Sequence, residues 1–146
     1  MLGEFSDRCE TIEECYEFML AYAAQGLPNE QGSQSGGQIR DYLDRAVRAI
    51  ASLAEICRTA VEEERLEPAE RCQAFFGVLE RDARDSLAAL ELVLAQPVIS
   101  SQLVDNLNAS IHLRALLTDL FLLSEVVKTQ HAPAKPVDPH GYGFME

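Results

Sequence analysis

Residues 39–60 read IRDYLDRAVRAIASLAEICRTA, and their apolar side chains recur at alternating spacings of four and three. This is the spacing of the a and d positions of a heptad, which places one apolar seam along a long helix. We therefore expect a helix from Gln38 to Glu64 whose seam packs against neighbouring helices. The seam consists of Ile39, Leu43, Ala46, Ile50, Leu53, Cys57 and Ala60.

A shorter amphipathic segment precedes this helix. A T-x-x-E capping box begins at Thr11, so the first helix is expected from Thr11 to Gln25, with Ser6 or Asp7 as an earlier alternative cap. The residues after it, 27–37, are rich in Gly, Ser, Asn and Gln and predict a loop.

Two more helices follow the heptad segment. Pro68 suits the first turn of a helix that continues to about Ala95, where Pro97 stops it. Ser100 or Ser101 then supplies the N-cap of a last helix that reaches about Lys128. Four helices joined by short connections predict an all-α fold, an antiparallel up-down-up-down four-helix bundle over residues 1–129.

Residues 130–146 form a separate segment in this prediction. They contain Pro133, Pro136 and Pro139, and proline at this density prevents a helix. We expect an extended C-terminal tail. Its end carries Tyr142 and Phe144, which we interpret as anchors that dock on a partner protein or on a neighbouring copy of the chain.

The charge of the chain narrows the classes of partner. Asp and Glu number 24 against 12 Lys and Arg, which gives a net charge of −12. Phosphate backbones and anionic lipid surfaces repel such a chain, so we expect neither nucleic-acid nor membrane binding. No signal-peptide pattern and no apolar run of membrane-spanning length is present. We therefore expect a cytoplasmic protein with reduced cysteines.

The expected last helix carries more apolar surface than one buried face requires. Between Leu116 and Val127, eight of twelve residues are large and apolar. Surplus apolar surface of this kind is typical of an interface. We therefore expect a homo-oligomer, with a dimer favoured, and take Leu120, Phe121 and Leu123 as interface candidates.

An acidic patch is expected where the second helix ends and the third begins. Negative charge is unfavourable at a helix C-terminus, because the helix dipole is negative there. A solvated surface explains such a patch, and so does a docking site for a basic partner. The patch consists of Glu62, Glu63, Glu64, Glu67 and Glu70.

Two chemical alternatives remain open on the sequence. Asp105, His112 and Asp119 share one stripe of the expected last helix, where a carboxylate could orient an imidazole or join it in binding a ligand or metal. Cys57 and Cys72 lie on helices that form a hairpin, so they could face one another as a redox-sensitive pair.

The sequence contains no nucleotide-binding, nucleophile-elbow or zinc-protease motif, and we expect no cofactor. The leading interpretation is a non-catalytic helical protein that acts through protein–protein interaction, as an adaptor, regulator or chaperone-like factor. The alternatives are a ligand- or metal-binding bundle and a thiol redox-sensing regulator.

Overall fold

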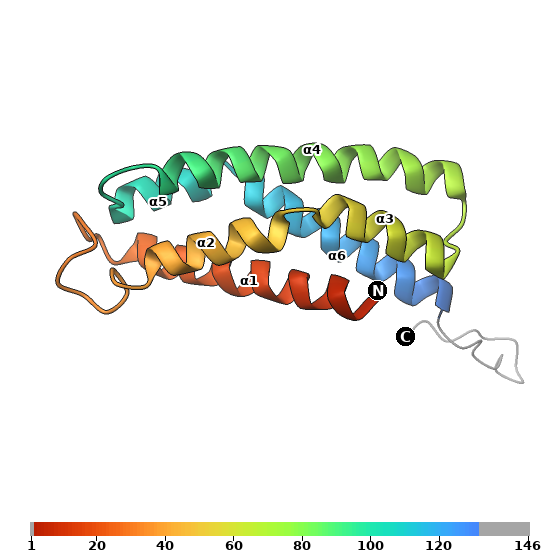
Figure 1. Ribbon diagram of the computed structural model, residues 1–146, viewed down its shortest axis with the longest axis horizontal. Helices are drawn as coiled ribbons and strands as arrows, with labels where there is room; N and C mark the ends of the chain where they lie inside the picture. Colours follow the sequence, from red (N-terminus) through yellow and green to blue (C-terminus); the bar gives the residue numbers. More distant parts are fainter. Residues whose placement is uncertain (1, 132–146) are drawn as a thin grey trace, which may run out of the picture.

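The computed structural model describes residues 2–131, and within them it contains helices and no strand (Figure 1). The expected all-α class is therefore confirmed for this part of the chain. None of these helices is both long and apolar enough to cross a membrane. In chain order the helices are α1 (Leu2–Ala24), α2 (Ile39–Ile50), α3 (Leu53–Glu64), α4 (Ala69–Leu94), α5 (Ser101–Ala109) and α6 (His112–His131).

The heptad seam is buried as predicted, but it does not lie on one continuous helix. All seven seam residues are buried. The prediction of an unbroken helix is nevertheless wrong, because Ser52 adopts a left-handed conformation (φ 61°) that separates α2 from α3. A straight helix drifts away from a seven-residue repeat, and the break lets both halves keep the seam toward the core.

A side chain from α1 satisfies the carbonyl groups at this break. The Arg8 Nη1 atom donates to the carbonyl oxygens of Arg48, Ala49 and Ala51 at 3.3, 3.2 and 2.6 Å. The last carbonyls of a helix have no partner within the helix, and a cation at that end also complements the dipole. Arg8 thus acts as a distant C-terminal cap for α2.

The expected last helix is also divided, and the prediction of a single helix from Ser100 to Lys128 is wrong. Its start is confirmed, because the Ser100 hydroxyl accepts from the Leu103 backbone N–H at 3.0 Å. Ile111, however, has a φ of 61°, which separates α5 from α6. In consequence α5 packs mainly on α1, whereas α6 packs mainly on α4.

The left-handed conformation at Ile111 leads to a stability prediction. A β-branched residue in this region is strained by roughly 1–3 kcal/mol, whereas glycine adopts it freely. The Ile111 side chain is exposed and loses little packing when it is removed. The greater entropy of glycine in the unfolded chain offsets part of the relieved strain, so we expect Ile111→Gly to raise the free energy of unfolding by a net value of about 1 kcal/mol. Urea denaturation measures this change, and Ile111→Ala, which keeps the strain, should show no gain.

The first helix starts earlier than the capping box predicts. It begins at Leu2, and the Thr11 hydroxyl donates to the Asp7 carbonyl oxygen one turn back instead of capping an end. The extra turns bury Phe5 in the core. The end of the helix follows the prediction, since Gly26 takes a left-handed conformation with φ 67°.

Candidate interaction site

The outward face of α6 carries two large apolar side chains. Phe121 is 46% exposed and Leu122 is 53% exposed. Of the other two interface candidates, Leu120 is fully buried in the core of the chain and offers no surface to a partner. Leu123 is also largely buried, at 5% exposure, but it lines a groove between α6 and α4. A helical repeat that assigns Leu113, Leu116, Leu117, Leu120 and Leu123 to the core leaves Phe121 and Leu122 outside it, so the sequence contained the signal that separates them.

A groove lies between the N-terminal half of α1 and the C-terminal half of α6. Its volume is about 480 Å³. Apolar side chains line it from both helices, and three carboxylates stand among the lining residues. The lining consists of Phe5, Ser6, Cys9, Glu10 and Glu13 from α1, and Phe121, Ser124, Glu125, Val127 and Lys128 from α6.

A second groove, of about 280 Å³, lies on the other side of α6, against α4. Phe75, Leu122 and Val126 give it an apolar surface, and the only charged side chains that line it are Glu67 and Arg71, which have opposite signs. The two exposed apolar residues of α6 therefore each border a different groove: Phe121 the α1–α6 groove, and Leu122 the α4–α6 groove.

The acidic patch lies at the end of α3 and the start of α4, beside the end of α6. Glu62, Glu63, Glu67 and Glu70 are exposed, whereas Glu64 is partly covered and lies 3.3 Å from the His131 Nε2 atom. Gln130 on α6 binds the turn between α3 and α4. Its side chain accepts from the Glu67 N–H at 2.9 Å and donates to the Glu67 carbonyl oxygen at 2.6 Å. Nothing in the sequence pairs Gln130 with Glu67, so this contact was not predicted.

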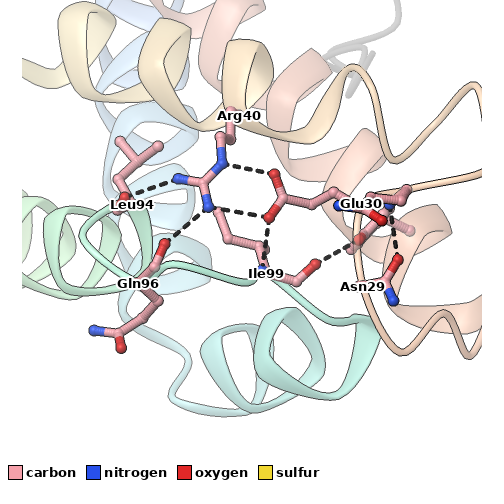
Figure 2. Close-up of polar contacts among 8 residues, drawn as sticks. Asn29, Glu30, Arg40, Leu94, Gln96 and Ile99 are labelled. Carbon is pink, nitrogen blue, oxygen red and sulfur yellow. Dashed lines mark hydrogen bonds and ion pairs between the residues drawn. The ribbon is translucent and has the colours of Figure 1, made fainter.

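A polar cluster at the opposite end ties the loop after α1 to the connection between α4 and α5 (Figure 2). The Arg40 Nε and Nη2 atoms donate to the Glu30 carboxylate at 2.6 and 3.0 Å. Arg40 also donates to the carbonyl oxygens of Leu94 and Gln96, and Glu30 accepts from the Ile99 N–H. The hydrogen bonds from Arg40 hold the pKa of Glu30 below its usual range. Every charged group of this cluster is bound within the chain, so its role is structural.

The three residues of the proposed ligand stripe are not brought together. Asp105 is exposed on α5, and His112 is the first residue of α6, beyond the break. Asp119 is only 9% exposed, and its Oδ2 atom has no hydrogen-bond partner. Burial and the nearby Asp82 carboxylate raise the pKa of Asp119 to about 7. Within residues 2–131, no group of three or more His, Cys, Asp or Glu residues is placed to hold a metal ion.

The structure gives no support to pairing of Cys57 with Cys72. All four cysteines are free. Cys57 is buried, and desolvation raises its pKa to about 12, with a smaller effect from the Cys9 thiol. Cys72 instead lines the α4–α6 groove. Because the thiolate is the reactive form, a pKa this high makes Cys57 a slow nucleophile.

The two tail anchors, Tyr142 and Phe144, lie outside the described residues. Comparison of the chain with protein-family models, curated proteins and solved structures finds no match.

Proposed function

We propose that this protein is a non-catalytic cytoplasmic helical protein that acts through protein–protein interaction, as an adaptor, regulator or chaperone-like factor. In this proposal the six helices form an antiparallel four-helix bundle in which α2–α3 and α5–α6 each serve as one broken member, followed by the proline-rich tail. The observation that supports it most is the outward face of α6, where Phe121 and Leu122 are exposed side by side between two grooves.

We further propose that the protein is a homodimer, and that the α4–α6 groove is the face where two copies meet. This groove is apolar, and its two charged lining residues, Glu67 and Arg71, balance one another. A chain with a net charge of −12 can bring two copies together most easily at such a neutral surface. Tyr142 and Phe144 are proposed as additional anchors, on the second copy or on another protein.

The dimer proposal has a direct test. The wild-type chain should sediment at twice its mass of 16.2 kDa at micromolar concentration, and Leu122→Asp should sediment at that mass, because it places a charge in the apolar face. Leu92→Asp is the matched control: Leu92 is 66% exposed on α4, does not line the groove, and should leave the dimer intact. A wild-type monomer, or equal dissociation by both variants, would show that the α4–α6 groove is not a dimer interface.

A further inference from the structure

We propose that the α1–α6 groove is a docking site for a basic amphipathic helix of a partner protein. This inference rests on the proposed protein-binding function, but it concerns the other groove and a different kind of partner. The dimer can therefore be wrong while this site is correct, and the reverse holds as well.

The groove exists because the last two helices have different packing partners. Since α5 packs mainly on α1 and α6 packs mainly on α4, α6 makes only a limited contact with α1, and the groove lies along this contact. Phe5, which is buried, and the partly buried Cys9 line the groove from α1. Phe121 and Val127 line the facing side, so an apolar side chain entering the groove contacts both helices.

The shape of the groove favours a helix as its occupant. A groove between two helices accepts the side-chain ridge of a third helix, with apolar residues presented at every third or fourth position. The described part of the chain has no β-strand, so it offers no sheet edge to which an extended peptide could add. A volume of about 480 Å³ accommodates several side chains but not a whole helix, which would lie along the groove with one face inserted.

The charged residues that line the groove indicate that the partner surface is positively charged. Glu10, Glu13 and Glu125 line it, and the single cation, Lys128, is 3.6 Å from Glu125. Glu10 and Glu13 form no ion pair with any residue between 2 and 131. The negative charge of these two carboxylates acts on the groove lining. Burial, together with Glu13 and Glu10, raises the pKa of the Cys9 thiol to about 11. Lysine or arginine side chains flanking the apolar face of a bound helix would pair with these carboxylates.

The same charges argue against other occupants. A second copy of this chain has a net charge of −12 and would bring like charges together at this groove. Nucleic acid would place its phosphates against the carboxylates. An amphipathic helix with basic flanks satisfies both the apolar lining and the acidic residues.

The test uses the full-length protein and a synthetic probe. The probe is a fluorescein-labelled peptide of about 18 residues, which is five helical turns, with leucine on one face and lysine on the others. A second peptide carries glutamate in place of every lysine. Fluorescence anisotropy should show binding of the basic peptide that weakens as salt increases, and binding of the acidic peptide at least about tenfold weaker.

Two variants of equal charge locate the site. Glu10→Gln combined with Glu13→Gln removes two carboxylates at the groove and should weaken binding of the basic peptide by about five- to tenfold. Glu62→Gln combined with Glu63→Gln removes the same charge from two residues of the acidic patch that do not line this groove, and should change binding less than about twofold. Circular dichroism melting of both variants checks that each has folded.

Three outcomes overturn the inference. The first is equal weakening by the two double variants, which shows attraction to the overall negative charge. The second is equal binding of the basic and acidic peptides. The third combines two results: saturating peptide converts a wild-type dimer to monomer, and the Leu122→Asp variant remains a dimer. Together these results show that a second copy of the chain occupies the groove. A monomeric wild-type protein that still meets the binding expectations overturns the dimer and supports this site.

Discussion

Asp119→Leu should raise the free energy of unfolding at pH 8 by about 2–4 kcal/mol, since replacing an uncompensated buried charge with an apolar side chain removes its desolvation penalty. Asp119 is almost fully buried on α6, its Oδ2 atom has no partner, and Asp82 on α4 adds a second negative charge. No cation pairs with Asp119 among the described residues. Protonation of Asp119 removes its negative charge, and with it the cost of burying that charge beside Asp82.

The same substitution should change the pH dependence of stability. The pKa of Asp119 is raised from 3.8 to about 7 in the folded chain, so between these values the folded state binds more protons than the unfolded state. The stability of the wild-type protein should therefore fall as pH rises through this window, and the loss should be complete above pH 7. In Asp119→Leu this component of the slope should be absent.

Urea denaturation at pH 5 and pH 8 measures both effects. The advantage of Asp119→Leu should be much larger at pH 8 than at pH 5. Asp105→Leu, at an exposed aspartate on α5, is the control and should show no such difference. An advantage of the same size at both pH values would mean that the variant gains only from packing and that Asp119 is not protonated in the folded chain.

Arg40→Met should lower the free energy of unfolding by about 2–3 kcal/mol. The substitution removes two hydrogen bonds to the Glu30 carboxylate and leaves the carbonyl groups of Leu94 and Gln96 without this donor. Charge-assisted hydrogen bonds of this kind are stronger than neutral ones, and partly buried groups left unsatisfied carry a desolvation penalty.

Arg48→Met is the matched control, because Arg48 pairs with Asp44 at 3.0 Å on an exposed helix surface. Exposed pairs contribute little, so we expect a loss below about 0.5 kcal/mol. Thermal denaturation of the two variants compares them directly. Adding Glu30→Gln to Arg40→Met should recover part of the loss, since the unpaired carboxylate is then gone. Equal losses in Arg40→Met and Arg48→Met would contradict a structural role for the polar cluster.

Local signals predicted much of the fold. The heptad spacing of residues 39–60 identified a buried seam, Ser100 identified the start of a helix, and Gly26 identified the end of one. Each of these depends on residues close together in the chain. The helix breaks at Ser52 and Ile111 were missed because neither residue is a usual helix breaker, and Arg8, which satisfies the carbonyls before the first break, is forty or more residues away in sequence.

The candidate site was predictable only in part. The apolar excess of α6 was recognised, and Phe121 is exposed as an interface residue requires. Leu120 was assigned to the same interface although the helical repeat places it in the core. Leu123 belongs to the core as well, but it also lines the α4–α6 groove. The α1–α6 groove could not be predicted, because it depends on the break at Ile111, after which α6 packs mainly on α4 and not on α1. The pairing of Glu30 with Arg40 could not be predicted either, since a loop conformation brings them together.

The break at Ile111 also determines how α6 is rotated about its own axis relative to α5. On a continuous helix, the buried residues of α5 and those of α6 would fall on nearly opposite sides, since successive residues turn by 100°. Asp105, His112 and Asp119 would then share one side, as the sequence suggested. In the structure, the left-handed conformation of Ile111 changes this rotation within one residue. The apolar stripes of α5 and α6 therefore both face the core, and Asp119 is buried with the stripe of α6. Inserting a single residue into α6 just after the break would rotate the remainder by 100° and expose its buried stripe, whereas changing the side chain at the break would not. The number of residues in this connection is therefore under stricter constraint than their identity.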